Sequence, residues 1–186
     1  AHQIASNLAA LCYMVPLSLA ISTSARVSYW RGAGDEAHAR RLAWLGLQVA
    51  GALGLALAAG VWLARDAIAT VYSPDPPVVA LASGLLVWVA AYHAADGMQT
   101  MCIFVLRSYR ITVAPLVIYC ALLWGGGLAG GYWLAYKNVA AVDQWQTNPT
   151  PFWIASATAL WLTAIIFIVM LRWALRPTPS PTHTKT

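Results

Sequence analysis

Five polar side chains lie close together in a sequence that is otherwise strongly apolar. Tyr92, His93, Asp96, Gln99 and Thr100 supply a phenol, an imidazole, a carboxylate, an amide and a hydroxyl group. At about 100° of rotation per residue, an α-helix places all five within an arc of about 120°. Such a face suits a wet interior site, where these groups can converge on a cation or a polar ligand. The spacing therefore predicts a helix with one polar, cavity-facing side.

Asp96 is the residue of this face that most needs an explanation. It is the only acidic residue deep inside any of the long apolar segments. A charge at the middle of a bilayer costs about 2.5–3.5 kcal/mol on insertion scales, so acids at that depth commonly serve transport or proton relay. A buried carboxylate can bind either a proton or a metal cation, and the two compete. We interpret Asp96 as an ion-coupling residue; the alternative is a packing residue that hydrogen-bonds a neighbouring helix.

Other chemistry finds little support in the residues. The sequence has no Ser-His-Asp set, metal-ligand cluster or second intramembrane carboxylate, which predicts a non-enzyme with no cofactor beyond Na⁺ or H⁺ as a coupling ion. Haem in a membrane protein ordinarily needs two histidines that face each other, but the histidines other than His93 are terminal or in loops. The cysteines lie inside apolar runs and are interpreted as small packing residues. These residues are His2, His38, His183, Cys12, Cys102 and Cys120.

The composition indicates which elements must position this polar face. Hydrophobic residues make up 60% of the 186 residues and charged residues only 9%, which is too little polar surface for a water-soluble globule. A bilayer core about 30 Å thick needs about 20 mostly apolar helical residues. Five segments meet that requirement, so we expect an all-α integral membrane protein in contact with lipid. The predicted spans cover residues 4–24, 42–64, 78–106, 113–136 and 152–171.

The basic residues predict how these spans are oriented. Lys and Arg are retained on the cytoplasmic side of membranes. Of the 11 Lys and Arg residues, all but Arg65 and Lys137 fall in the first loop, the third loop or the C-terminal region. We therefore place these three segments, and the C-terminus, in the cytoplasm. Apolar runs separate the cations, and they are not grouped with aromatic residues on a soluble face, so nucleic acid is not an expected partner.

Local signals refine the spans. Pro16 removes one backbone hydrogen bond from the first span and predicts a kink. Asp35 and Glu36 are expected in the first turn of a short interfacial helix that precedes the second span. The proline-rich segment 177–186 predicts a disordered tail. Aromatic residues near the span ends, Trp153 among them, fit interfacial anchors rather than a stacking platform for bases.

Three stretches of this sequence together resemble the multidrug and toxic compound extrusion (MATE) transporters. The first runs from Ala1-His-Gln-Ile-Ala-Ser-Asn-Leu through Met14-Val-Pro-Leu-Ser to Gly32-Ala-Gly-Asp-Glu-Ala, like the eighth helix of that family and its following loop. The second combines Tyr92, Asp96, Gln99 and Leu106-Arg107, as in the tenth helix, and the third is Trp124 with Gly127-Leu-Ala-Gly-Gly-Tyr, as in the eleventh. The resemblance extends over residues 1–176.

The resemblance implies an identity for each part of the chain. It implies that the five spans are helices 8–12 of a twelve-helix, two-lobe exporter, so that the chain is a partial C-terminal lobe. Helices one to seven, including a partner glutamate on helix seven, would lie upstream. It further implies drug efflux across a bacterial inner membrane, driven by Na⁺ or H⁺. Asp96 matches the cation-site carboxylate of the tenth helix, with Tyr92 one turn earlier beside it.

Departures from the family pattern fall mainly outside this site. Ser108, Ile111 and Ala129 stand where the family usually has glycine, an acid and proline, and they bear on loop and helix geometry. The leading hypothesis is export of cationic or amphipathic small-molecule drugs by rocking of two lobes. A lipid or polysaccharide-precursor flippase of similar architecture is the alternative. A non-transporting membrane scaffold, or a membrane enzyme, is the alternative from another class.

Overall fold

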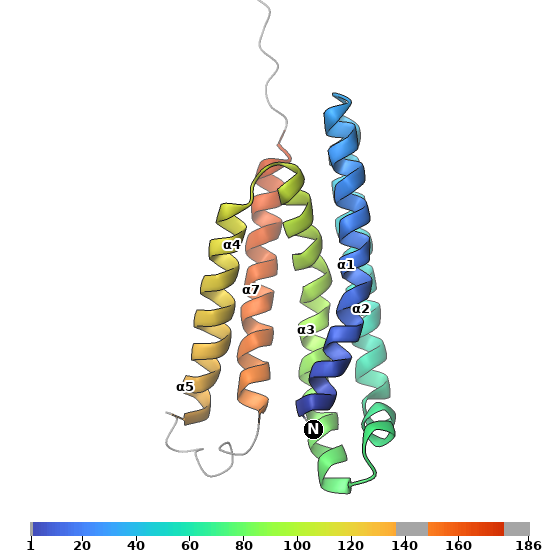
Figure 1. Cartoon of the computed structure of the whole chain (residues 1–186), viewed down its shortest axis with the longest axis vertical. Coiled ribbons are helices and arrows are strands. Elements are labelled where there is room, and N and C mark those ends of the chain that lie inside the picture. Colours follow the sequence, from blue (N-terminus) through green and yellow to red (C-terminus); the bar gives the residue numbers. More distant parts are fainter. Residues whose placement is uncertain (1, 137–148, 177–186) are drawn as a thin grey trace, which may run out of the picture.

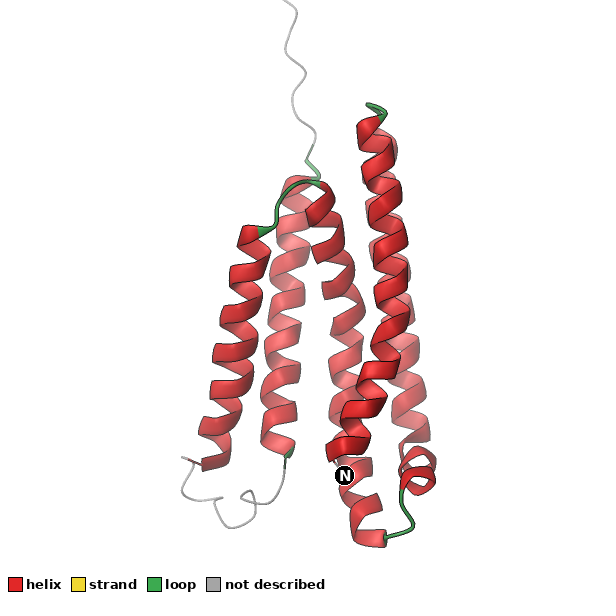
Figure 2. Ribbon diagram, viewed as in Figure 1, coloured by secondary structure: helices red, strands yellow, loops and turns green. Residues whose placement is uncertain are grey.

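The computed structural model describes residues 2–136 and 149–176, and these form helices joined by short loops (Figure 2). Five helical segments are long and apolar enough to cross a membrane, as the hydropathy pattern predicts. In chain order the elements are α1 (His2–Gly32), α2 (Glu36–Tyr72), α3 (Pro76–Ser108), α4 (Val113–Cys120), the π-helix η1 (Ala121–Ala129), α5 (Gly130–Tyr136) and α7 (Thr150–Ala174). The all-α fold class is thus confirmed. The predicted tail, 177–186, lies outside the described residues.

The helices extend beyond the apolar segments by which they are recognised. Pro16 lies inside α1, which continues on both sides of it. The expectation of a separate interfacial helix before the second span is wrong, because Glu36 begins α2 itself and that helix runs without interruption for 37 residues. Asp35 is its N-cap, and the carboxylate accepts a hydrogen bond of 2.9 Å from the backbone N–H of His38. The charged residues that precede the second span therefore belong to the same helix as the span.

Figure 1 shows how these helices are arranged. All run roughly along the long axis of the molecule, with α1, α2 and α3 on one side and α7 with the α4–η1–α5 helix on the other. α3 is the central element, since it packs against α1, α2 and α7. The α4–η1–α5 helix packs chiefly against α7. α3 thus carries its polar face between the two groups of helices.

Small residues bring α2 and α3 close together. A Cβ atom added at Gly97 would lie 2.8 Å from the backbone oxygen of Ala50, and one at Gly54 would lie 3.1 Å from the backbone oxygen of His93. Neither neighbour is a side chain that can rotate away. Such contacts are the usual means by which membrane helices approach closely when lipid provides no hydrophobic driving force. They fix the rotation of α3, and with it the direction of its polar face.

A polar cluster joins three helices at the end of the molecule where α1 and α3 finish and α2 begins, which we call the Arg-rich end. Arg31 Nε donates to Glu36 Oε1 at 2.9 Å, and its guanidinium also donates to the backbone oxygen of Ser108. Tyr109 Oη donates to Glu36 Oε2 at 3.4 Å, and Ser108 Oγ donates to the backbone oxygen of Ser24 at 3.1 Å. Burial first, and then the Glu36 carboxylate, raise the pKa of the Tyr109 phenol, which keeps it protonated as a donor.

The loop that follows α3 has a left-handed residue that is not glycine. Arg110 has φ +59°, a region that costs residues with a Cβ atom about 1–2 kcal/mol. Its N–H donates to the backbone oxygen of Arg107, which closes the turn. Ser108 and Ile111, two of the departures from the family pattern, flank this turn. Ser108 uses its side chain to join α3 to α1, a contact that glycine could not make.

Candidate functional site

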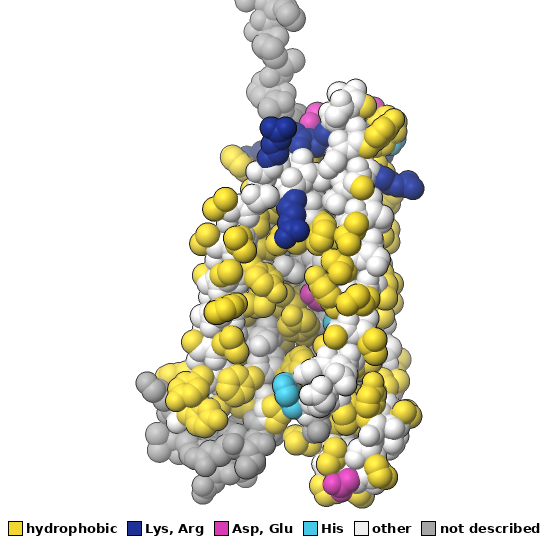
Figure 3. Space-filling model, viewed as in Figure 1, with side chains coloured by type: hydrophobic (Ala, Val, Ile, Leu, Met, Phe, Trp, Pro, Cys, Tyr) yellow, Lys and Arg dark blue, Asp and Glu magenta, His cyan; other side chains and the backbone are white. Residues whose placement is uncertain are grey.

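A cavity of about 1070 Å³ lies between α1 and α3 on one side and the α4–η1–α5 helix and α7 on the other. In the space-filling view it is a hollow between the two groups of helices, with an acidic side chain visible inside it (Figure 3). Side chains from α1, α3, α4, η1 and α7 line it, and most of them are apolar or aromatic. Its polar groups come mainly from α3.

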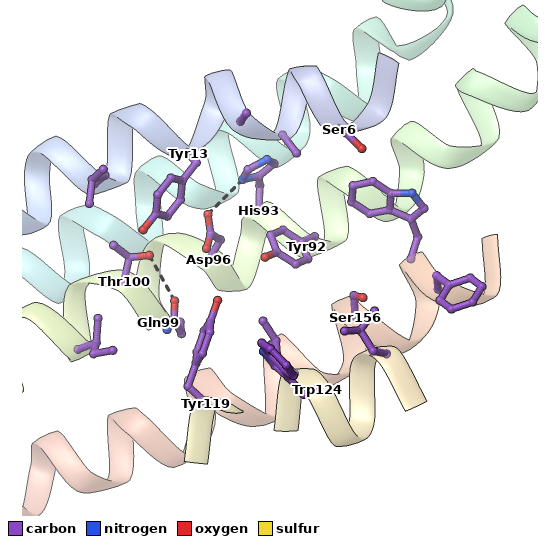
Figure 4. Close-up of a pocket in the computed structure, with 18 of the residues that line it drawn as sticks. Ser6, Tyr13, Tyr92, His93, Asp96, Gln99, Thr100, Tyr119, Trp124 and Ser156 are labelled. Atoms are coloured by element: carbon purple, nitrogen blue, oxygen red, sulfur yellow. Dashed lines mark hydrogen bonds and ion pairs between the residues drawn. The ribbon is translucent and has the colours of Figure 1, made fainter. Parts of the chain in front are cut away.

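All five residues of the predicted polar face line this cavity (Figure 4). His93, Asp96, Gln99 and Thr100 are buried, with exposed fractions of 2%, 3%, 4% and 1%. Thr100 Oγ1 donates to Gln99 Oε1 at 3.3 Å. The structure thus places these groups together, while their roles in binding stay predictions.

His93 and Asp96 form a close pair on consecutive turns of α3. His93 Nδ1 lies 3.5 Å from Asp96 Oδ2, and both groups are almost fully buried. Within the described part of the chain, neither ring nitrogen of His93 has a hydrogen-bond partner, and nor does Asp96 Oδ2. A buried polar group without a partner is costly, so a site of this kind favours an added ligand such as water or a cation.

Several aromatic residues of the cavity were not predicted as part of the site. Tyr13 comes from α1, Tyr119 from α4, Trp124 from η1 and Trp153 from α7. The Tyr92 and Trp153 rings meet edge to face, with centroids 6.3 Å apart. None of the four lies on α3, so no spacing in the sequence relates them to Asp96. The only feature of the sequence that could have pointed to these cavity residues is a polar or aromatic side chain within an apolar span.

Three residues lie where the sequence did not lead us to expect them. The sequence places Trp153 at a membrane interface and His2 at a terminus, but both line the cavity, and Trp153 Nε1 donates to His2 Nδ1 at 3.2 Å. Arg107, assigned to a loop in the sequence, belongs to the last turn of α3 and also lines the cavity. It is about 16 Å along the helix from Asp96, at a rise of 1.5 Å per residue.

These groups define what the cavity can bind. Among the described residues there is no group of three or more His, Cys, Asp or Glu side chains that could hold a metal ion tightly. One carboxylate in a cavity that is also lined by hydroxyl and amide groups suits a proton or a weakly held monovalent cation. Aromatic faces attract organic cations through their quadrupoles. The same space can therefore hold either a small cation or an aromatic, positively charged ligand.

Comparisons with known proteins relate the chain to one family. The family model described as MatE matches residues 1–133. A probable multidrug resistance protein NorM from Aromatoleum aromaticum is 34% identical over 177 residues, which are 94% of this chain and 37% of that protein. Multidrug resistance protein MdtK from Pectobacterium atrosepticum is 34% identical over 94% of this chain and 38% of its own length. PmpM from Pseudomonas aeruginosa is 34% identical over 91% of this chain and 35% of its own.

A solved structure has the same fold. The crystal structure of the eukaryotic MATE transporter AtDTX14 superposes with a TM-score of 0.80 at 18% identity, covering 93% of this chain and 39% of that one. The chain therefore spans less than two fifths of the length of the relatives that it matches.

Proposed function

Because this chain belongs to the MatE family, we propose that it forms part of a secondary exporter of cationic or amphipathic small molecules, driven by inward Na⁺ or H⁺. The relatives that support this are named as multidrug resistance proteins. The proposal assigns the chain a transport role and no enzymatic reaction.

The observation that carries the proposal is the buried carboxylate of Asp96, the only buried acid among the described residues, in the wall of an aromatic cavity. Asp96 can hold either the coupling ion or the positive charge of a substrate, but it cannot neutralise both at once. Entry of the ion therefore displaces the substrate, and the reverse also holds. Tyr92, Gln99 and Thr100 supply neutral oxygen atoms around the same space. Competition at one acid is sufficient to couple two opposite fluxes if the cavity opens to each side in turn.

The other half of this cycle is proposed to come from helices upstream of this chain. Alternating access needs a second lobe to rock against, and the family resemblance implies an N-terminal lobe and a carboxylate on helix seven. A cavity shared between two lobes would bring that carboxylate towards Asp96. The partners implied are the N-terminal lobe, membrane lipid and the small-molecule drugs.

An efflux measurement tests the proposal directly. Cells that produce the whole protein are loaded with the planar aromatic cation ethidium, and its fluorescence is followed in cells with and without the protein. Faster loss of ethidium that stops when both the Na⁺ and the H⁺ gradients are collapsed is the expected result. Equal loss in both kinds of cell would reject export of this class of compound.

Lipid flipping is the second candidate, and Arg107 is the observation that favours it. A guanidinium on the cavity wall can pair with the phosphate of a lipid headgroup. The acid deep in the same cavity favours a cationic ligand more strongly, since it is buried and Arg107 is exposed. Movement of a fluorescent phospholipid between leaflets, with no ethidium export, would favour this candidate.

We further propose that the Arg-rich end faces the bacterial cytoplasm. In Figure 3 the Lys and Arg side chains visible in that view gather at this end. The basic residues Arg31, Arg107 and Arg172 all fall in the last turns of helices that finish there. The asymmetry of basic residues supports this orientation and a cytoplasmic C-terminus.

Cysteine labelling checks this orientation. The substitution Ser73→Cys lies between α2 and α3, and Thr112→Cys lies between α3 and α4, at opposite ends of the bundle. In intact cells, a membrane-impermeant thiol reagent should label the first variant and reach the second only after permeabilisation, because the two loops face opposite sides of the membrane. The reverse pattern of labelling would show that the proposed orientation is wrong.

A further inference from the structure

The fourth membrane-spanning segment changes its helix type in the middle. α4 and α5 are α-helical, but the nine residues of η1 between them form a π-helix. At its end the N–H of Gly130 donates to the backbone oxygen of Gly125, five residues earlier. π-helical segments are rare and are frequently found at functional sites. Most π-helical segments are single turns, so a π-helix of nine residues is long, and its sequence should explain it.

The glycines of η1 are not required by close packing. A Cβ atom added at Gly125 would meet nothing within 4 Å, and at Gly126 and Gly127 the nearest atoms would lie at ordinary contact distances of 3.6 Å and 3.5 Å. This differs from Gly97, where a backbone atom leaves no room. Three consecutive glycines weaken an α-helix, because glycine is among the residues least favourable to it. Their effect here is therefore on the conformation of the helix and not on its packing.

The surroundings of η1 leave it room to change. Only 11% of the apolar window of this span is buried within the described chain, compared with 44% for α3 and for α7. Three side chains of η1, Leu123, Trp124 and Leu128, line the cavity from the side opposite α3. Figure 4 shows Trp124 facing the cavity across from Tyr92 and Asp96. A shift of one residue in helical register rotates the following side chains by about 100°. Such a shift would move these side chains relative to the cavity.

We propose that η1 is a joint at which this helix converts between π-helical and α-helical turns, and that the conversion moves Trp124 into and out of the cavity. The two forms differ in the cavity wall that they present, so a ligand that contacts Trp124 in only one of them shifts the population towards that form. The conversion between π-helical and α-helical turns is inferred from the structure of η1 alone. The role in gating the substrate rests on the proposed export function.

A distance measurement tests the joint. Spin labels at Val117 and Trp133 flank η1, and both side chains are largely exposed, at 60% and 55%, and do not line the cavity. In the whole protein without native cysteines, we expect the distance between the labels to be broadly distributed and to narrow when ethidium or Na⁺ is added. Gly125→Ala/Gly126→Ala should give a single narrow distribution under all conditions, because alanine favours the α-helix. The same distribution in both proteins would overturn the proposal.

An efflux measurement with a matched control tests the consequence. Gly125→Ala/Gly126→Ala should leave the amount of folded protein unchanged or raised and lower ethidium efflux per molecule by about fivefold or more, as for coupled conformational changes. Gly60→Ala is the control, since Gly60 also lies mid-helix, in α2, with nothing within 4 Å of an added Cβ atom. It should keep wild-type efflux. Wild-type efflux in the double variant would refute the gating role.

The two measurements also separate this inference from the export proposal. If the wild-type protein moves no ethidium, the proposed export of this cation fails, and the label distances still decide whether η1 is a joint. If wild-type protein exports ethidium and the distances are the same in both proteins, the joint is rejected and the export proposal stands.

Discussion

Asp96→Asn in the whole protein is expected to reach the membrane in the normal amount and to lose ion-driven efflux by about 100-fold, because it removes the charged partner of the proposed coupling ion, and loss of such a partner costs about 2–5 kcal/mol. Asparagine keeps the size of the side chain and its ability to hydrogen-bond, but it has neither the charge nor the titratable proton. The 3.5 Å approach of His93 Nδ1 remains possible with an amide oxygen. The measurement is ethidium efflux per folded molecule over a range of Na⁺ concentrations and pH values.

Two companion variants make that result specific. Asp66→Asn removes an exposed acid, with a side chain 73% accessible, near the opposite end of α2 from the Arg-rich end, and should keep wild-type ion dependence. Tyr92→Phe should weaken ion dependence in the same direction as Asp96→Asn but less, because it removes one neutral oxygen from the cavity. A purely structural Asp96 predicts less folded protein with proportionate activity. Normal dependence on Na⁺ and pH in Asp96→Asn would eliminate the coupling role.

Gly97→Ala is expected to lower the free energy of unfolding by about 1–3 kcal/mol, the usual cost of overpacking a well-packed contact. Its new methyl group would lie 2.8 Å from the backbone oxygen of Ala50, so α2 and α3 must separate. A shift of α3 also moves Asp96, which lies next to Gly97 in the chain. Gly97→Leu should go further and prevent recovery of folded protein. Thermal unfolding of the purified whole protein, followed by loss of monodisperse material, measures Gly97→Ala, and the yield of monodisperse protein after purification measures Gly97→Leu.

Gly84→Ala is the matched control for this contact. Gly84 is in the same helix, but a Cβ atom there would meet nothing within 4 Å. Alanine should therefore be neutral or slightly stabilising, because it is the better helix former. If Gly97→Ala and Gly84→Ala unfold at the same temperature, the close contact between α2 and α3 does not contribute to stability as we infer.

Hydropathy and helical period were sufficient to predict the five helices and the polar face of α3. Both are properties of one segment at a time. The cavity depends on several segments, because Tyr13 reaches it from α1 while Tyr119 and Trp124 reach it from the α4–η1–α5 helix. The packing that brings these helices together leaves no period in the sequence. Arg107 was assigned to a loop for a related reason: hydropathy falls at the membrane surface, whereas the backbone hydrogen bonds of α3 continue.

The π-helix was also beyond prediction, for a different physical reason. The Gly125–Gly127 run shows that an α-helix is weak there, but a weak α-helix can kink, unwind or widen. The choice depends on how α4 and α5 are held by α7, which is a tertiary effect. The start of α2 at Glu36 shows the opposite situation. The acidic pair Asp35 and Glu36 was recognised as marking a helix start, but Asp35 is the N-cap and not a residue of the first turn, and the assumption that the membrane span begins a separate helix was wrong.

The polar cluster at the Arg-rich end has a consequence for the order in which the protein is made. Glu36 follows Arg31 by five residues, so the guanidinium finds its carboxylate as soon as the turn between α1 and α2 has been synthesised. Its other acceptor, the backbone oxygen of Ser108, lies 77 residues later. The α1–α2 hairpin can thus insert with this charge already neutralised, and α3 docks onto a finished pair of helices. We therefore expect α3 to pack last against the α1–α2 pair, where the backbone oxygen of Ser108 completes the hydrogen bonding of Arg31.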